Sequence, residues 1–177
     1  MDEIKRVKRE LIYKGKIVNF YEDSMALPNG KTAIWDFIEH KGAAAVVPVT
    51  AEGKILMVRQ YRNALERYTL EIPAGAVNDP KEPKEECAAR ELEEETGYKA
   101  EKLEWLMNVN TTVAFCNEII GIYVAENLIP ASQHLDEDEF LNVEEHELDE
   151  LLSMVFDGRI TDGKTAAALL AYKVKRG

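Results

Sequence analysis

Acidic side chains crowd one short segment, residues 90 to 98, and they are the residues of this chain best suited to chemistry. Glu91, Glu94 and Glu95 stand at positions i, i+3 and i+4, so an α-helix would place their carboxylates on one face. Like charges in this arrangement destabilise a helix by roughly 0.2–0.5 kcal/mol per pair. Carboxylate oxygens suit hard cations such as Mg²⁺, which often share one or two carboxylates with substrate phosphates. The spacing therefore predicts a metal site, with a solvated acidic helix face as the alternative.

The residues around these glutamates predict a helix that is packed against a core. Pro83 suits the first turn of a helix, and Gly97 suits its end. Between them, Ala88, Ala89 and Leu92 form an apolar stripe next to the carboxylates. A packed helix with a rigid entrance is better suited to holding ligands than a freely solvated one.

Composition limits the classes of partner. The chain has 177 residues, 46% of them apolar, which is enough for a well-buried core. A net charge of −11 argues against binding to a nucleic-acid backbone or an anionic membrane. The two cysteines are too few for a disulfide framework, and no apolar run reaches the ~20 residues of a membrane span. We therefore expect a cytoplasmic protein without nucleic-acid or membrane partners.

Hydrophobic patterning predicts strands on either side of the acidic helix and two helices at the end of the chain. An N-terminal hairpin is expected from strands over residues 10–27 and 31–39, joined by a turn at Pro28–Gly30. Two C-terminal helices are also expected. The first should end at Gly158, and the second should begin near Asp162. The other expected strands cover residues 43–49, 54–60, 68–72, 103–112, 118–126 and 140–146. This order favours a mixed sheet between helices.

The acidic segment resembles the signature motif of the Nudix hydrolases. That motif is Gly, five residues, Glu, seven residues, then Arg-Glu-aliphatic-x-Glu-Glu-x-Gly-aliphatic, and here Glu82 and the segment from Arg90 to Gly97 match it. Gly75 lies one residue too far from Glu82, as a one-residue insertion in the loop 78–81 would explain. Tyr98 replaces the final aliphatic residue.

Stretches outside the motif resemble the ADP-ribose pyrophosphatase group of this family. The resemblance implies a Nudix-type α/β/α sandwich with a mixed sheet and an N-terminal antiparallel β-hairpin. It also implies an N-terminal hairpin region over residues 1–42, a Nudix hydrolase domain over residues 43–177, and hydrolysis of ADP-ribose to AMP and ribose 5-phosphate. The matching stretches are residues 27–31, 44–49, 59–62, 70–75, 123–128, 138–140 and 157–162.

The resemblance also implies roles for residues of the motif. Mg²⁺ is the expected cofactor, and Mn²⁺ could replace it. The metal ligands would be the backbone carbonyl of Ala74 and the carboxylates of Glu91, Glu94 and Glu95. Arg90 should hold the glutamates in place by charge-assisted hydrogen bonds, with Glu82 steadying Arg90.

A general base is often supplied in this group by a glutamate on a loop before a late strand. In this chain that loop contains Glu137, which alignment favours, and Glu139 as the second candidate. A glutamate of the acidic helix, such as Glu95, could serve instead. A solvated acidic loop is the alternative for Glu137 and Glu139.

Candidate substrate-binding residues lie far from the motif in sequence. Arg62 matches a phosphate-contacting arginine of the family, although it could form an ordinary ion pair with Glu66. Trp35 aligns with an aromatic residue that stacks on adenine in some relatives, or it could be a core residue. His40 and Glu118 are further candidates. Because family members contribute the N-terminal hairpin across a two-fold axis, we expect a homodimer, in which Trp35 serves its own or the partner's site.

One segment departs from the group and leaves the substrate open. Relatives typically carry Ser-Pro-Gly-Phe-Ser-Asn-Glu, where the proline marks ADP-ribose specificity, but residues 112–118 read Thr-Val-Ala-Phe-Cys-Asn-Glu. Loss of the proline and glycine changes the freedom and bulk of this loop. A GDP-sugar or dinucleotide hydrolase is therefore an alternative, as is a non-catalytic nucleotide-binding Nudix module. The retained like charges of the helix argue against the non-catalytic reading.

Overall fold

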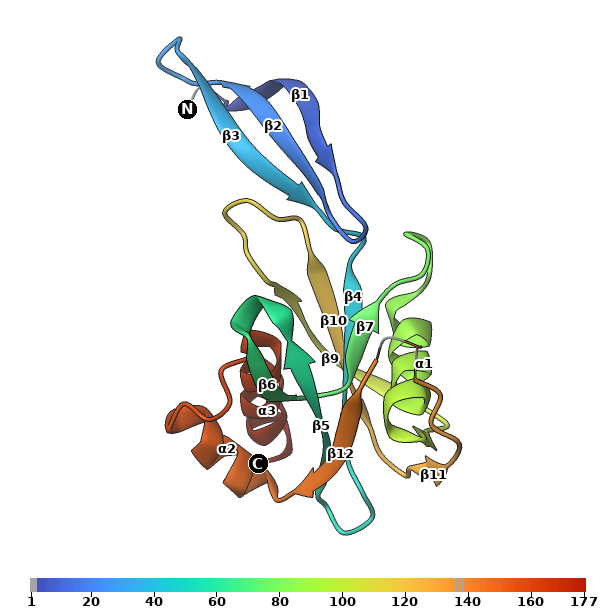
Figure 1. The fold of residues 1–177 in the computed structure, drawn as a ribbon. Helices are drawn as coiled ribbons and strands as arrows, with labels where there is room; N and C mark the ends of the chain where they lie inside the picture. The colour runs from blue at the N-terminus through green and yellow to red at the C-terminus, as the bar shows by residue number, and fades with distance from the viewer. Residues whose placement is uncertain (1–2, 136, 138) are drawn as a thin grey trace. The chain divides into compact units, whose positions relative to one another are not determined.

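The computed structural model describes residues 3–135, 137 and 139–177, which fold into two compact units (Figure 1). The N-terminal unit comprises the chain up to Gly42 together with Asn110–Ile119. The main unit comprises Ala43–Val109 and Ile120–Gly177. A segment from the middle of the chain therefore belongs with the N-terminal strands.

Three antiparallel strands form the sheet of the N-terminal unit: β1 (Lys5–Lys14), β2 (Asn19–Ala26) and β3 (Thr32–Glu39). The prediction of one strand over residues 10–27 was wrong, because Gly15 N donates to Val18 O at 2.9 Å and reverses the chain there. The second turn lies at the predicted place, and Gly30 adopts φ +77°. A glycine within a run of alternating residues was the signal for the first turn.

The Arg9 side chain stabilises this sheet through polar and cation–π contacts. Its Nε and Nη2 donate to the two carboxylate oxygens of Asp23 at 2.7 and 2.6 Å. The same guanidinium lies 3.6 Å from the ring centroid of Phe37 and 5.3 Å from that of Tyr21. An ion pair and cation–π contacts thus hold the three strands together on one face.

The segment 110–119 pairs with the end of β3 within the N-terminal unit. Ile38 N donates to Phe115 O at 2.6 Å, and Asn117 N donates to Ile38 O at 3.3 Å. The loop that departs from the family pattern is therefore anchored to a strand by its backbone.

Two larger sheets build the main unit. In the first, β4 (Ala43–Pro48) pairs parallel with β10 (Ile119–Ala125) and antiparallel with β7 (Ala74–Ala76), and β9 (Leu103–Asn110) borders β10. The second is antiparallel, in the order β12 (Leu141–His146), β5 (Ile55–Arg62), β6 (Arg67–Glu71). A 3₁₀ turn at Asn63–Leu65 links β5 to β6, and β8 (Tyr98–Lys99) pairs with β11 (Ile129–Pro130).

Three helices complete the main unit: α1 (Lys84–Thr96), α2 (Leu148–Phe156) and α3 (Gly163–Arg176). The predicted end of α1 and start of α3 are confirmed, whereas α2 ends two residues before the predicted Gly158. Gly97 terminates α1 with φ +72°, and the Asp162 side chain caps α3 by accepting from Thr165 N. Within the described part of the chain, no helix is long and apolar enough to cross a membrane.

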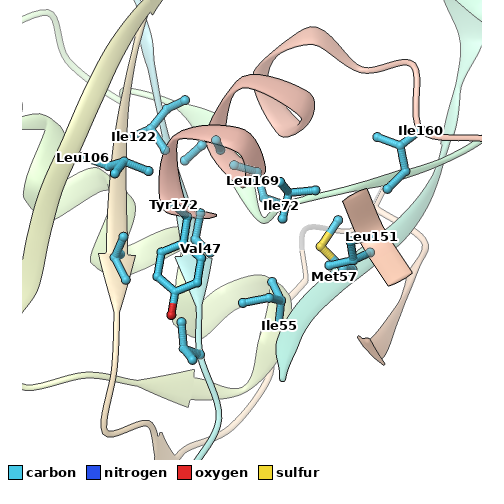
Figure 2. Close-up of a cluster of buried hydrophobic side chains, with 14 of the residues drawn as sticks. Val47, Ile55, Met57, Ile72, Leu106, Ile122, Leu151, Ile160, Leu169 and Tyr172 are labelled. Atoms are coloured by element: carbon cyan, nitrogen blue, oxygen red, sulfur yellow. The ribbon is translucent and has the colours of Figure 1, made fainter. Parts of the chain in front are cut away.

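Alternating residues of β4 bury both faces of its sheet. Ala44 and Val46 pack with Cys87 and Leu92 of α1. Ala45 and Val47 face the opposite way, into the larger core that Figure 2 shows between the strands and the C-terminal helices. Residues such as Ile55, Met57, Leu151, Leu169 and Tyr172 line that core. The continuous apolar run is thus explained by helices on both faces, and the predicted α/β class with a mixed sheet is confirmed.

Candidate functional site

Two of the three spaced glutamates of α1 are buried rather than solvated. Glu91 and Glu95 retain 7% and 2% of their accessible surface, because the face of α1 that carries them packs on β4 and β7. Glu94 lies at the edge of that face, partly exposed. The alternative of a freely solvated acidic face therefore does not describe Glu91 and Glu95.

The backbone of β7 lies directly against these carboxylates. Ala74 N donates to Glu95 Oε2 at 3.1 Å. A Cβ atom at Gly75 would lie only 2.0–2.4 Å from the carboxylate atoms of Glu91. A side chain at residue 75 would thus displace the Glu91 carboxylate from its present position. The structure places Ala74 beside Glu95, and the predicted role of its carbonyl as a metal ligand stays a prediction.

Burial strongly perturbs both acids. Desolvation raises the pKa of Glu91 to about 7, even though the neighbouring Arg90 charge opposes the shift. Desolvation and the nearby Glu91 charge raise the pKa of Glu95 to about 8. Buried carboxylates of this kind are stabilised as anions when a cation joins them.

The donor set fits a hard divalent cation. It offers carboxylate and backbone oxygens and no thiolate or imidazole, which is the chemistry that Mg²⁺ selects. Among the described residues, no three acidic, histidine or cysteine side chains are already gathered as a closed metal cluster. Instead, Arg90 pairs with two of the glutamates.

Arg90 is the hub of the helix side chains. Its Nη1 donates to Glu91 Oε1 at 2.6 Å and to Glu94 Oε2 at 2.7 Å, and its Nη2 donates to Ala76 O at 3.1 Å. Its Nε lies 3.4 Å from Glu82 Oε1. This geometry supports the predicted holding role of Arg90 and the steadying role of Glu82.

Glu82 lies close to Arg90 although its distance in sequence from Gly75 is one residue longer than in the family motif. Asn78 N donates to Glu82 Oε2 at 2.5 Å, and Glu82 N donates to Asp79 O at 2.9 Å. This turn is thus stabilised by its own hydrogen bonds, and the one-residue insertion in the loop stays a prediction.

The two candidate bases differ in their relation to the buried acids. Glu139 is among the charges that raise the pKa of both Glu91 and Glu95, so it lies within electrostatic reach of them. It precedes β12 by two residues, and Leu141 of β12 lies opposite Gln60 of β5. Glu137 is exposed in the turn before β12, and its neighbours 136 and 138 lie outside the described residues.

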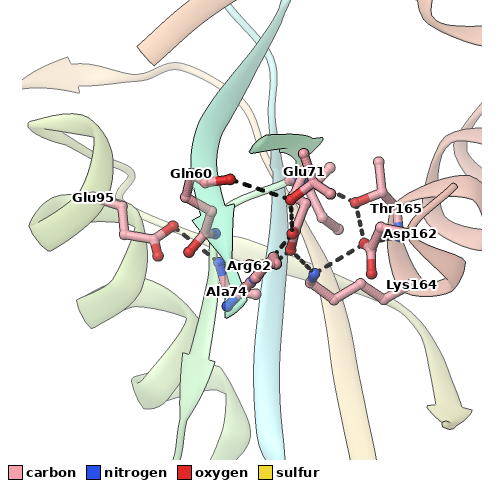
Figure 3. A network of polar contacts seen from close by, with 10 residues as sticks. Gln60, Arg62, Glu71, Ala74, Glu95, Asp162, Lys164 and Thr165 are labelled. Atoms are coloured by element: carbon pink, nitrogen blue, oxygen red, sulfur yellow. Dashed lines mark hydrogen bonds and ion pairs between the residues drawn. The ribbon is translucent and has the colours of Figure 1, made fainter. Parts of the chain in front are cut away.

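Arg62 does not pair with Glu66, as the alternative had it, but with Glu71 of β6. Its Nε and Nη2 each donate to one oxygen of Glu71, both at 2.7 Å (Figure 3). Burial alone would raise the pKa of Glu71, but the hydrogen bonds from Arg62 and the charge of Lys164 lower it to about 2. Glu71 is therefore an anion held in the interior.

Sequence reasoning missed Glu71, Lys164 and Gln60. The signal for Glu71 was a single charged residue between the core positions Leu70 and Ile72. Lys164 gave no comparable signal, because its contact with Glu71 joins residues 93 positions apart. Within the described chain, Gln60 Nε2 is the buried side-chain nitrogen without a hydrogen-bond partner, and nothing in the sequence indicated it.

The remaining predicted residues lie in the N-terminal unit. Trp35 is 45% exposed, so the alternative that it is a core residue of this unit is wrong. His40 Nδ1 lies 3.0 Å from Glu118 Oε1, and the Thr111 hydroxyl donates to Glu118 Oε2 at 2.7 Å. The structure thus brings His40 and Glu118 together, and the substrate-binding roles of all three remain predictions.

Comparison with known proteins decides the family. A model of the NUDIX domain matches residues 39–169, which include the acidic helix, β7 and the loop before β12. This chain belongs to the NUDIX domain family. The resemblance to Nudix hydrolases found in the sequence is therefore confirmed.

Individual relatives of this Nudix protein span nearly its whole length. It is 43% identical over 175 residues to an ADP-ribose pyrophosphatase of Bacillus subtilis, covering 98% of this chain and 94% of that protein. It is 44% identical over 169 residues to a methanol dehydrogenase activator of Bacillus methanolicus, covering 94% and 91%. A crystal structure of an ADP compounds hydrolase matches with a TM-score of 0.86 at 22% identity, covering 98% and 94%, and this match confirms the Nudix fold.

Replacing Gly75 by alanine should disrupt the carboxylate site of this Nudix protein. The added Cβ would displace the Glu91 carboxylate, so we expect Mn²⁺ affinity, measured by titration calorimetry, to fall by roughly 10–100-fold. Gly163→Ala is the matched control, because a Cβ there meets nothing within 4 Å. Equal Mn²⁺ affinity in Gly75→Ala and the wild type would show that Glu91 does not need this backbone contact.

Proposed function

We propose that this chain is a Mg²⁺-dependent pyrophosphatase that cleaves ADP-ribose, or a related ADP-sugar, to AMP and the sugar phosphate. The observation that carries the proposal is the pair of buried carboxylates, Glu91 and Glu95, set against the backbone of β7. The full-length similarity to a protein named ADP-ribose pyrophosphatase supports the choice of substrate.

Glu91, Glu94 and Glu95, with the carbonyl of Ala74, would hold the metal, for which Mn²⁺ could substitute. The ion would neutralise the pyrophosphate and lower the pKa of the attacking water. Arg90 keeps Glu91 and Glu94 in position through its two Nη1 hydrogen bonds. Its own charge also limits the repulsion among the glutamates.

Arg62 and Glu139 take the remaining roles. The guanidinium of Arg62, half-exposed on β5, binds the anionic diphosphate, since its planar donors match phosphate oxygens. Glu139 accepts the proton of the attacking water. We prefer Glu139 to Glu137 because its charge reaches Glu91 and Glu95, and to Glu95 itself because Glu95 is reserved for the metal.

A non-catalytic role is the second candidate. The relative named methanol dehydrogenase activator and the altered loop 112–118 favour an interaction module or a different nucleotide ligand. An interaction module has no need to bury two carboxylates whose ionisation is opposed by burial. The hydrolase therefore explains more of the structure.

Direct turnover measurements test the proposed function. Purified protein with Mg²⁺ should release AMP from ADP-ribose faster than it cleaves ADP-glucose, GDP-mannose or NADH, as followed by chromatography of the mononucleotide products. Faster cleavage of GDP-mannose or NADH would contradict the assignment of ADP-ribose as the preferred substrate. No turnover of any of the four would favour the non-catalytic module.

Glu95→Gln should abolish turnover without unfolding the protein. The amide is a poor metal ligand, so we expect kcat to fall at least ~100-fold. The melting temperature without metal should stay the same or rise, because a neutral side chain replaces a carboxylate whose ionised form is penalised by burial. Glu93→Gln is the control, since Glu93 pairs with Lys99 instead. Near wild-type turnover in Glu95→Gln would contradict the metal assignment.

A homodimer formed through the N-terminal unit is part of the proposal. Its sheet exposes large apolar side chains, which a partner chain would cover. These include Val7, Leu11, Ile12, Tyr13, Ile34 and Trp35. The net charge of −11 and two free cysteines support a cytoplasmic enzyme whose partner is a second copy rather than a nucleic acid.

Mixing Trp35→Ala with Glu95→Gln, after the activity of each alone is measured, tests whether Trp35 serves the partner's site. In Trp35→Ala the metal ligands are intact, and in Glu95→Gln the tryptophan is intact. If sites are shared across the dimer, co-refolding equal amounts should restore about a quarter of wild-type activity, since about half of the dimers are mixed and each has one complete site. No recovery, with mixed dimers shown by native mass spectrometry, would contradict a site shared across the dimer.

A further inference from the structure

Glu71 is a buried anion for which the proposed reaction has no use. It retains 2% of its accessible surface and lies on β6 between residues of the apolar core. Its oxygens accept from Arg62 at 2.7 Å each, from the Thr69 hydroxyl at 2.6 Å, and from Lys164. Burying an ion pair carries a desolvation cost that its contacts often only offset, so stability alone does not explain Glu71.

Strand register places Arg62 and Glu71 on one face of the β5–β6 pair. Val58 lies opposite Glu71, and Gln60 lies opposite Thr69. Because side chains alternate along a strand, Arg62 points to the same side as Gln60 and therefore to the side of Glu71. Glu71 accepts hydrogen bonds from the guanidinium edge formed by Nε and Nη2, which leaves Nη1 directed away from Glu71.

Lys164 supplies a second positive charge to Glu71. Its ammonium group contacts Glu71 and lies 2.9 Å from Asp162 Oδ2, and its side chain is 9% exposed. Asp162 in turn caps α3 through Thr165 N at 3.0 Å, and the Thr165 hydroxyl accepts from Ile72 N at 3.0 Å. Figure 3 shows this network joining β5, β6 and the start of α3. The position of Glu71 is thereby tied to three elements.

The network lies within electrostatic reach of the carboxylate site. Figure 3 shows Arg62 and Lys164 together with Glu95 and Ala74, and both cations interact electrostatically with the Glu95 carboxylate. Arg62 is therefore held near the glutamates of α1, where the diphosphate would have to lie.

We propose that Glu71 is a positioning residue, which holds the Arg62 guanidinium in the orientation that binds the substrate diphosphate, while Lys164 balances its charge. This inference rests on the proposed function. An arginine held by a rigid fork binds phosphate without first losing side-chain freedom, whereas a free one must be ordered by the substrate. Glu71 should therefore act on substrate binding through Arg62 and not on the chemical step.

Glu71→Gln tests this role by breaking the fork with little change in size. We expect KM for ADP-ribose to rise about 10-fold or more, with kcat within about 3-fold of the wild type. In the Arg62→Gln background the same change should add little to KM, since the residue through which it acts is already gone. Independent, additive effects of Glu71→Gln and Arg62→Gln would overturn the assignment.

Glu144→Gln is the matched control. Glu144 of β12 accepts two hydrogen bonds, at 2.5 and 3.0 Å, from Arg59, which lies on β5 like Arg62. Arg59 and Arg62 point to opposite faces of β5. Both single variants should lower the melting temperature, and only Glu71→Gln should raise KM. An equal rise in KM in both variants would show that any broken fork on β5 has this effect and would overturn the assignment.

A second variant separates positioning from stability. Glu71→Met combined with Lys164→Met replaces the buried ion pair by apolar side chains of similar length, which usually restores stability. We expect the melting temperature to recover while KM stays raised, because Arg62 still lacks its fork. Recovery of KM together with the melting temperature would make Glu71 a purely structural residue. A wild type that neither binds nor cleaves ADP-ribose would overturn the proposed function and this inference together, whereas an active wild type with unchanged KM in Glu71→Gln would overturn this inference alone.

Discussion

Burial of carboxylates against bare backbone is the constraint on which the site depends. In β7, Gly75 leaves room for the Glu91 carboxylate because it has no side chain, and the backbone N–H of Ala74 donates to Glu95. Desolvation opposes their ionisation, so the protein must supply positive charge, and Arg90 does so from the same helix. The helix, its cap at Gly97 and the turn before it all serve to keep this face of α1 against β7.

The main unit balances buried charge in two different ways. Around Glu91, one arginine is shared among three glutamates, which leaves an excess of negative charge suited to a cation. Around Glu71, two cations share two anions, since Lys164 contacts both Glu71 and Asp162, and Arg62 stays half-exposed. A site that is negative on one side and carries an arginine on the other matches a metal bound to a diphosphate.

Much of the fold could be predicted because it follows from local rules. The helix ends at Gly97 and Asp162, the buried strand at β4 and the acidic face of α1 depend on residues close together in sequence. The prediction of the N-terminal hairpin was wrong at residues 15–18, where a short turn interrupts an alternating pattern that resembles one strand. The grouping of residues 110–119 with the N-terminal strands also had no local signal, since it depends on backbone pairing with Ile38.

The sequence by itself determined which acidic side chains share one face of the helix, because i, i+3, i+4 spacing sets this whatever the rest of the chain does. It also determined the family, through a long motif in which spacing and residue type are both constrained. Only the tertiary structure decided that Arg62 is held by Glu71 rather than Glu66, and that Lys164 completes the network from 93 positions away. The partner of a buried charge depends on how strands and helices pack, because packing decides which opposite charge lies within reach of it.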